Sequence, residues 1–297
     1  MKPYIVTDST ADFPKGFQFD DFAIMQMRYM LDDEEFDGVE KKLTAKQFYE
    51  RMKAGAKSNT SMIDEVTLRG TIEPLLKEGR DVLYIVFSSG LSGTFDNATR
   101  VAADLRREYP GAKLALVDSL NASIGEGLLV WYALKKRDEG ASFEQLVEYV
   151  DSMVDHVCSY FTVDDLHHLA RLGRVTKTAA FIGTLANIKP VLFVNHAGKL
   201  IPIGKVISRK KSLKALVDKM GEKMLPAQKQ EVVFIGHGLC EEDARFVKDL
   251  VCERFGIAPE KVVIDDIGPV IGAHTSAGVV ALFFLGSDKR EKNDTSE

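Results

Sequence analysis

The amino-acid sequence predicts an α/β protein of two domains, an N-terminal domain built on a parallel sheet and a C-terminal domain with a mixed sheet. In the first half, short β-rich runs alternate with amphipathic helical patterns, which is typical of parallel sheets covered by helices. In the second half, a β-hairpin pattern indicates antiparallel strands. The length of 297 residues suits one large or two ordinary domains.

Composition and charge narrow the classes of protein to consider. The chain is 45% hydrophobic and 28% charged, as in globular proteins, and its net charge of −5 argues against nucleic acid as the main partner. Three scattered cysteines (Cys158, Cys240 and Cys252) share no metal-ligand spacing and suit a reducing compartment. The N-terminus does not resemble a signal peptide, and the apolar run 279–285 is far below the roughly 20 residues that span a bilayer. We therefore expect a cytoplasmic protein.

The first half is predicted to alternate strands with helices. Strands are expected at 4–7, 22–31, 82–87 and 113–117, and helices at about 44–55, 64–77, 94–108, 121–137 and 143–156. Thr44 with Gln47 and Ser142 with Gln145 form capping boxes that mark two of the helix starts. The uninterrupted apolar run at 82–87 is typical of a strand buried on both faces. These units predict a parallel sheet with helices on both sides.

The second half has a different pattern. Helices are expected near 164–171, 176–187, 211–224 and 241–254, and strands at 191–195, 200–206, 232–235, 262–267 and 279–285. The first two of these strands form the hairpin. We place the domain boundary near residue 158, which gives domains of 1–158 and 159–286 and a polar tail of 287–297.

Polar clusters follow three strands of the predicted parallel sheet. They are Asp8-Ser9-Thr10, residues 88–94 and Asp118-Ser119. Carboxyl ends of parallel strands share one edge, where open α/β folds bind ligands. Residues 88–94 add two glycines, which permit close approach of a ligand, and precede a helix N-terminus, which favours anions. The simpler alternative is that these residues only cap the following helices.

Several catalytic motifs are absent from the sequence. Residues 88–94 lack the lysine and spacing of a P-loop, and Thr94 stands where a nucleophile elbow needs its last glycine. Gly125-Glu126-Gly127 matches a dinucleotide-binding fingerprint only in part. The six histidines show no metal-ligand spacing. His237 and His274 lie in predicted glycine-containing loops, where a histidine is usually structural but could donate to an anion.

Two further groups of residues stand out. Thr60 and Ser61 add hydroxyls in a predicted loop between two helices, where they could bind a ligand or simply form a turn. Basic residues gather in the second half of this acidic chain: Arg171, Arg174, Lys177, Arg209, Lys210 and Lys211. A docking surface for a partner and an ordinary solvated face are both open explanations.

Together these segments resemble the DegV family of bacterial lipid-binding proteins, over nearly the whole chain. The residues that carry the resemblance are 6–12, 60–61, 88–94 and 117–120 in the first half, and 172–175, 188–190, 208–211 and 267–275 in the second. Each piece is short, and it is their order and spacing that make the match. The resemblance implies two α/β domains with a fatty acid in a buried tunnel.

The resemblance also implies roles for particular residues. Thr60 and Ser92 match the positions that hold the carboxylate, and His274 matches a histidine near it. We include their neighbours in the expected ligand site: Ser61, Ser89, Gly93 and Thr275. Members that serve fatty acid kinase (the FakB type) deliver the acid for phosphorylation to acyl-phosphate, toward phospholipid synthesis. Because the kinase binds ATP, we expect no catalysis, metal or cofactor here.

A fatty acid kinase is thus the expected protein partner. It would dock on the basic residues Arg171, Arg174, Arg209, Lys210 and Lys211, which could also touch a membrane surface briefly. The sequence departs from the family pattern at Met62-Ile63-Asp64, where Gln-Pro-Ser is usual, at Leu172, where glycine is frequent, and at Ser276-Ala277, where Gly-Pro is common. The first and third departures flank the expected site and could alter ligand preference.

Two other functions are compatible with parts of the sequence. The first is a phosphotransferase or hydrolase that uses His274 or His237 with Ser92, by analogy with the architecture of dihydroxyacetone kinase subunits. The sequence lacks the nucleotide-binding motif, the set of metal ligands and the nucleophile elbow that such an enzyme would need. The second is a DNA-binding regulator, which the acidic pI of about 5.8 disfavours.

Overall fold

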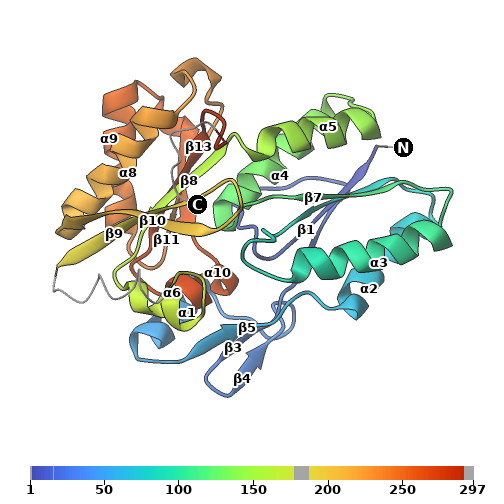
Figure 1. Cartoon of the computed structure of the whole chain (residues 1–297), viewed down its shortest axis with the longest axis horizontal. Coiled ribbons are helices and arrows are strands. Elements are labelled where there is room, and N and C mark those ends of the chain that lie inside the picture. Colours follow the sequence, from blue (N-terminus) through green and yellow to red (C-terminus); the bar gives the residue numbers. More distant parts are fainter. Residues whose placement is uncertain (1, 16, 177–186, 291–297) are drawn as a thin grey trace.

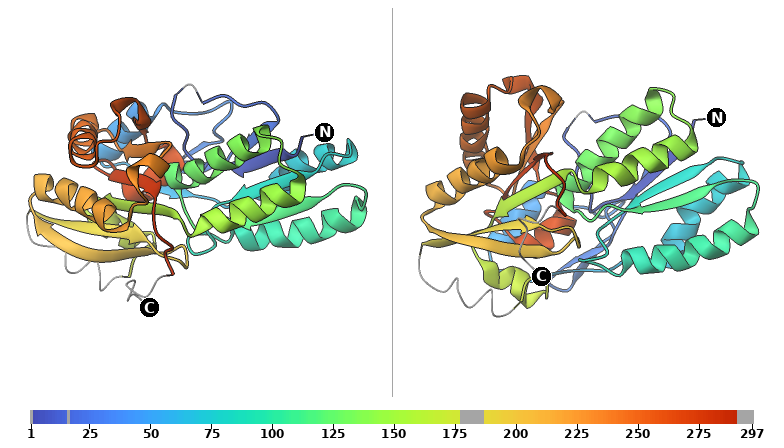
Figure 2. Two further views of the ribbon diagram at one scale, coloured as in Figure 1. Left: turned by 90° about the horizontal axis from the view of Figure 1, so that it is seen from above. Right: turned by 45° about the horizontal axis from the view of Figure 1, so that its top comes forward.

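The computed structural model describes residues 2–290 except 16 and 177–186, and it confirms the predicted fold class (Figure 1). Its strands form a parallel sheet of four strands, a mixed sheet of six and a small sheet of three. The six-stranded sheet and its helices α8 and α9 lie at the end of the molecule away from the N-terminus (Figures 1 and 2). Among the described residues, no helix is both long and apolar enough to cross a bilayer.

The four-stranded sheet is all parallel. Its order is β2-β1-β6-β7, with bounds Phe22–Met25, Tyr4–Asp8, Val82–Val86 and Leu114–Asp118. Helices α2 (Glu65–Lys77) and α3 (Thr94–Glu108) pack together, as do α4 (Ser123–Asp138) and α5 (Phe143–Val154). Every residue of β6 is buried, as the uninterrupted apolar run predicts.

The six-stranded sheet is mixed. Its order is β10-β9-β8-β13-β11-β12, with bounds Leu200–Ile207, Ile188–Val194, Val157–Thr162, Val280–Leu285, Val233–His237 and Val262–Asp266. Only β11 and β12 pair in parallel. Helices α8 (Arg209–Lys223) and α9 (Glu241–Phe255) pack together against it. The boundary predicted at residue 158 falls inside β8 and stays a prediction.

Helix α4 joins the two larger sheets. It contacts β1 of the parallel sheet and β8, β11 and β13 of the mixed sheet. A helix packed on opposite sides has little solvent-facing surface, and most of α4 is accordingly buried, including Glu126. The two domains therefore share one hydrophobic core around this helix.

The small sheet corrects two sequence predictions. The single strand predicted at 22–31 is wrong, because β2 and β3 (Tyr29–Leu31) belong to different sheets. The loop predicted at 59–61 is partly wrong, because Ser58–Thr60 form strand β5, paired with β3. The acidic stretch after β3 forms the hairpin to β4 (Glu34–Phe36). These short strands were hidden because each has only three residues.

The loop predicted at 268–275 is also wrong, because Pro269–Thr275 form helix α10. Gly268 is its N-cap and Pro269 its first residue, where proline is favoured because its ring fixes a helical φ. Both capping boxes are confirmed, at α1 (Ala45–Lys53) and α5. The helix predicted near 164–171 is α6 (Leu166–Arg171). The helix predicted at 176–187 lies, but for its end residues, outside the described residues.

Candidate ligand-binding site

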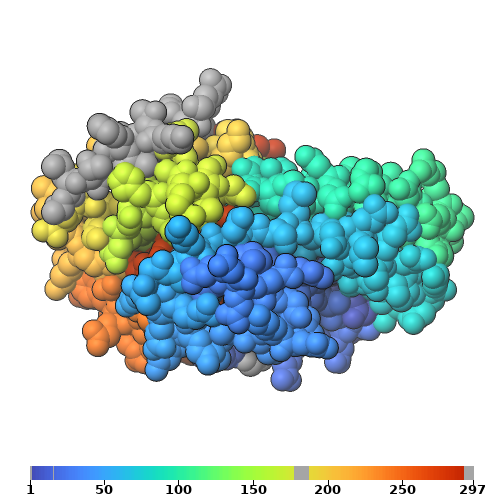
Figure 3. All heavy atoms as spheres, turned by 90° about the horizontal axis from the view of Figure 1, so that it is seen from below, coloured from blue at the N-terminus to red at the C-terminus, as the bar shows by residue number. Residues whose placement is uncertain are grey.

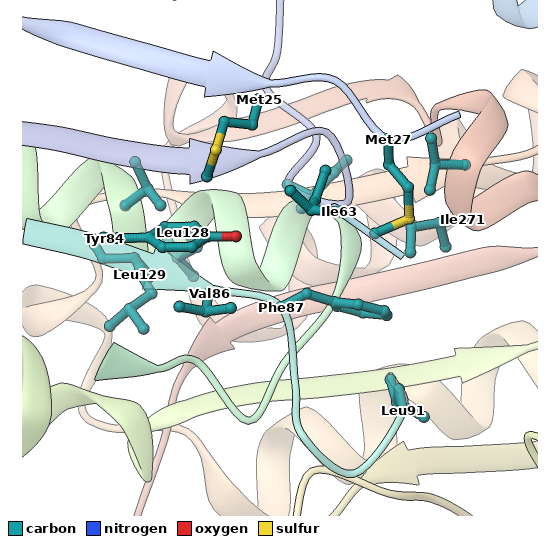
Figure 4. Packing of buried hydrophobic residues seen from close by; sticks show 14 of the residues in the cluster. Met25, Met27, Ile63, Tyr84, Val86, Phe87, Leu91, Leu128, Leu129 and Ile271 are labelled. Atoms are coloured by element: carbon teal, nitrogen blue, oxygen red, sulfur yellow. The ribbon is translucent and has the colours of Figure 1, made fainter. Parts of the chain in front are cut away.

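A cavity of about 60 Å³ lies where elements of both larger sheets meet. Its wall is mainly apolar and comes from the end of β6, the start of α4, strands β8 and β13, and helix α10. Figure 4 shows three of its residues, Phe87, Leu91 and Ile271, close together in the core. An apolar cavity with a few polar groups is the usual form of a small-molecule site.

His274 is the most distinctive polar group in the cavity wall. Its Nε2 lies 2.9 Å from the hydroxyl oxygen of Thr60, which joins α10 to β5. Its Nδ1 is buried and has no hydrogen-bond partner among the described residues. Leaving a buried polar atom unpaired is costly, and such atoms in native proteins call for an explanation. A ligand oxygen is one explanation.

The Thr60–His274 pair always has one hydrogen-bond donor that their mutual bond does not use. A neutral imidazole has one N–H, and the threonine has one O–H. Their mutual hydrogen bond uses one of these protons, whichever tautomer is present. The other proton remains available to an acceptor such as a carboxylate oxygen.

His274 is neutral at physiological pH. Its pKa is lowered to about 4, mainly by burial and in addition by the positive charges of Arg174 and Arg171 and by the nearby His168. The imidazole therefore presents a neutral hydrogen-bonding group rather than a fixed cation. A bound anion would reverse part of this effect.

Arg174 also lines the cavity, beside His274. It is half-buried, which lowers its pKa, and one of its terminal nitrogens donates to the Leu172 carbonyl at 2.6 Å. The sequence analysis placed Arg174 only in a docking surface, and a cavity position was not foreseen. Its cation would favour the anionic head of a ligand over a neutral one.

Helix α10 is held in place from several elements. The Ser58 hydroxyl and His168 Nε2 both lie within 2.7 Å of the Ala273 carbonyl oxygen, at 2.6 and 2.7 Å. The Tyr49 hydroxyl donates to the carbonyl of Ile267 at 3.0 Å. In Figure 3 the yellow-green surface around α6, which carries His168, lies beside the blue surface of the small sheet.

Both glycines of the loop 88–94 lie against other parts of the protein. A side chain at Gly90 would lie 2.4 Å from the Ala197 carbonyl, and one at Gly93 would lie 2.7 Å from Met62 Sδ. Protein atoms therefore occupy the space that these glycines leave. The Ser88 hydroxyl donates to Gly198 at 2.8 Å, so this loop docks the β9–β10 hairpin.

The remaining predicted ligand residues lie at different distances from the cavity. Of the seven, His274 and Thr275 line it. Ser92 bonds with the Thr94 hydroxyl at 3.0 Å, and Ser61 donates to the Arg28 carbonyl at 3.3 Å. Ser89 is exposed. Because Met62 packs on Gly93, the segment after Thr60 lies next to Ser92.

Comparison with known proteins places the chain in a family. It matches the model of the DegV family of uncharacterised proteins over residues 2–287. It is 38% identical to a DegV domain-containing protein of Clostridium perfringens, over 97% of this chain and 99% of the relative. The chain belongs to the DegV family.

Solved structures of other DegV proteins share the fold. A fatty acid binding DegV family protein of Streptococcus agalactiae has a TM-score of 0.82 and 28% identity, covering 97% of this chain and 100% of that one. DegV of Bacillus subtilis, described as a fatty acid binding protein, has a TM-score of 0.80 and 28% identity, with the same coverage. The family resemblance is thereby confirmed.

The basic residues of this DegV protein separate into groups. Arg209 donates to Asp243 at 2.8 Å and lies 3.8 Å from Asp164, so its charge is largely paired. Lys210 and Lys211 are exposed, with the Lys210 ammonium 5.2 Å from the Phe246 ring centroid. Arg171 is exposed on α6, and Lys177 lies outside the described residues.

Two buried carboxyl groups of this DegV protein were not foreseen. Asp8 and Glu126 are both fully buried, and the Thr10 hydroxyl contacts both, with 2.7 Å to Glu126. One hydroxyl proton cannot serve two carboxylates, so one carboxyl must be protonated and donate to Thr10. Burial raises the pKa of both carboxyl groups, but Asp8 accepts more hydrogen bonds, which lower its pKa, whereas the charge of Asp8 raises that of Glu126 further; Glu126 is therefore the neutral acid. Within the described residues, no group of three or more His, Cys, Asp or Glu could hold a metal ion.

Proposed function

We propose that this protein binds a long-chain fatty acid, with the acyl chain in the apolar cavity and the carboxylate at Thr60 and His274. One observation carries the proposal: His274 Nδ1, in the wall of an apolar cavity, is buried and has no partner within residues 2–290 as described, while Thr60 bonds with the other ring nitrogen. A carboxylate on a long apolar chain satisfies both features. The fatty acid binding described for two DegV relatives with 28% identity supports it.

The energetics favour such a ligand. Burying each methylene contributes about 0.8 kcal/mol, so a long chain supplies most of the affinity, against the lost freedom of the ligand. The carboxylate then needs mainly orientation, which the spare donor of the Thr60–His274 pair supplies. Arg174 adds a positive charge in the same wall.

The cavity must widen to take a long chain. Its volume of about 60 Å³ is well below the roughly 300–1,000 Å³ of typical ligand pockets. Much of the wall consists of Leu, Ile and Phe side chains, which can change rotamer without exposing polar groups. We therefore propose that ligand entry rearranges these side chains.

The other expected contacts belong to the same proposal. Ser92 and its neighbours Ser61, Ser89 and Gly93 would lie around the carboxylate, and Thr275 would lie beside His274. The segment after Thr60 packs against Gly93, which supports a shared site for Thr60 and Ser92. The Ser92 hydroxyl, now paired with Thr94, would reorient toward the ligand.

We further propose that the protein is a cytoplasmic carrier rather than an enzyme, and that it presents the carboxylate to a fatty acid kinase. Lys210 and Lys211, both exposed, would provide positive charge for docking the kinase or for brief contact with anionic lipid. Among the described residues Ser92 pairs with Thr94 rather than with His274 or His237, which gives no support to the hydrolase alternative.

Mass spectrometry of small molecules extracted from the purified protein tests the ligand. We expect a long-chain fatty acid, and a bound phosphate or sugar ester would contradict the proposal. The Ala281→Leu variant tests whether the acyl chain lies in the cavity, because it adds methyl groups inside the cavity wall. It should lower oleate affinity at least tenfold without unfolding the protein, because it fills the space that the chain needs.

A further inference from the structure

Asp12 joins three elements next to the cavity wall. Its carboxylate accepts from the Ser123 hydroxyl at 2.6 Å and from the Gly268 N–H at 3.0 Å. Ser123 begins α4 and lines the cavity, whereas Gly268 is the N-cap of α10, which carries His274. A single side chain from the loop after β1 thus connects the starts of both helices.

Two glycines, Gly127 and Gly268, lie close against Asp12. A Cβ at Gly268 would lie 2.3 Å from Asp12 Oδ1, and a Cβ at Gly127 would lie 2.1 Å from the Asp12 carbonyl oxygen. Because glycine has no side chain at these two positions, the loop that carries Asp12 fits between α4 and α10. The contacts are close enough that the position of Asp12 determines the position of Gly268.

The loop that carries Asp12 also constrains Ser123, which is part of the cavity wall. Its φ of +57° is unfavourable for a residue with a side chain. Its N–H donates to the Thr10 carbonyl at 2.8 Å, and its hydroxyl donates to Asp12. The hydroxyl proton is thereby directed out of the cavity, which keeps this part of the wall suitable for an acyl chain.

We propose that Asp12 is a positioning residue, which fixes the first turn of α10 against α4 and so holds His274 at the carboxylate end of the cavity. This inference rests on the proposed function, because it assigns His274 to the ligand. Asp12 itself does not line the cavity among the described residues. It acts through Gly268 and Ser123.

The surroundings of Asp12 are mostly acidic. Its pKa is raised to about 7, mainly by burial and in addition by the charges of Asp265 and Asp266 on β12. Glu126 of α4 and Tyr49 of α1 also feel its charge, while Lys15 lies 3.8 Å from Asp265 and His237 lies 3.5 Å from Asp266. Hydrogen-bond placement, rather than attraction to a cation, therefore holds Asp12.

Hydrogen exchange of the α10 amides, measured without ligand, tests the proposal directly. Asp12→Ala should speed exchange in 269–276 at least tenfold and weaken oleate binding about tenfold, because both anchoring contacts are lost. Asp12→Asn, which keeps an acceptor for Gly268, should restore both to within about threefold of the wild type. Ser142→Ala, which removes a cap at α5, is the matched control and should leave α10 unchanged.

Unchanged α10 exchange in Asp12→Ala, or equal acceleration over the whole chain, would overturn the proposal. If Asp12→Ala does not fold, Asp12→Asn is compared with Asp12→Glu, whose extra methylene moves the carboxylate away from its contacts with Ser123 and Gly268. We expect Glu to loosen α10 and Asn to preserve it; the reverse order would show that charge rather than placement matters, and would overturn it too. Failure of the wild type to bind oleate would reject the proposed function alone, since exchange is measured without ligand.

Discussion

The Thr60 hydroxyl and His274 Nε2 lie 2.9 Å apart, although 214 positions separate them in the chain. The contact joins the small sheet to α10, and the other ring nitrogen of His274 has no partner in the part of the chain that the structure describes. It depends on β5 pairing with β3 and on α10 being a helix, neither of which the sequence analysis predicted. The geometry of the site thus comes from two short elements.

Removing the Thr60 hydroxyl should weaken ligand binding. Thr60→Val keeps the shape and suits a strand, but it cannot bond with His274. We expect oleate affinity to fall about tenfold, which corresponds to roughly 1.4 kcal/mol. The measurement is isothermal titration with oleate, and Thr60→Ser, which keeps the hydroxyl, serves as the control and should bind normally.

Ser92 is the second predicted carboxylate contact. Ser92→Ala should cost about 1.5–3 kcal/mol of binding free energy if its hydroxyl turns from Thr94 to the carboxylate. The same titration measures it, together with a Thr60→Ala/Ser92→Ala double variant. Wild-type affinity in the double variant would show that neither hydroxyl holds the carboxylate.

Much of the fold followed from local sequence patterns. The helix predicted at 94–108 has the bounds of α3, and both capping boxes formed, because these signals depend on neighbouring residues only. The strand predicted at 22–31 failed because its two apolar parts enter different sheets. The hydrophobic pattern of a strand does not predict which other strand it pairs with.

The site was predicted less completely than the fold. The sequence located Thr60 and His274 but not their contact, which is set by tertiary packing. Arg174 was assigned to a surface because exposure cannot be read from an isolated basic residue. The sequence does contain a pattern that indicates the burial of Glu126. It is a glutamate between two glycines inside an apolar helix, which indicates close packing on both sides.

Glu126→Gln should stabilise the protein at alkaline pH. The raised pKa of Glu126 means that the folded state holds its proton more tightly than the unfolded chain. Stability is therefore lost as pH rises above the ordinary value of 4.5. Glutamine mimics the neutral acid and does not titrate, so thermal unfolding at pH 5 and pH 8 should show the gain mainly at pH 8. Glu126→Ala, which leaves Thr10 without this partner, should destabilise at both.

His274 should give the opposite pH dependence. Its pKa of about 4 lies below the ordinary 6.5, so the unfolded chain takes up this proton first. Stability from this group is complete above pH 6.5 and is lost as pH falls to 4, by at most about 3 kcal/mol. Thermal unfolding of His274→Gln over this range should lack that loss. A parallel pH dependence in wild type and variant would contradict the assignment.

Ligand binding should raise the pKa of His274. A carboxylate beside the ring stabilises the imidazolium, which offsets the effects of burial and of Arg174. An NMR titration of the ring proton, assigned by its absence in His274→Gln, measures this with and without oleate. An unchanged titration in the presence of saturating oleate would place the carboxylate elsewhere.

The basic residues of α8 provide the test of partner docking. Arg209 is paired with Asp243 and Asp164, so reversing it would disturb the fold as well as the surface. Lys210 and Lys211 are exposed and better suited to the test. The double variant Lys210→Glu/Lys211→Glu should bind oleate normally, because neither residue lines the cavity. Its kinase-dependent phosphorylation of the bound acid should fall, most sharply at low salt, because exposed charges attract a partner only when weakly screened.

The matched control reverses two exposed lysines of another helix, Lys46 and Lys53 of α1. It makes the same change in net charge at a different place, and it should leave phosphorylation unchanged if docking is local. Equal losses in both double variants would mean that net charge, rather than this part of α8, governs the encounter. Wild-type phosphorylation in the α8 variant across the salt series would move the docking surface away from these lysines, because a surface that uses their charge must respond to its reversal.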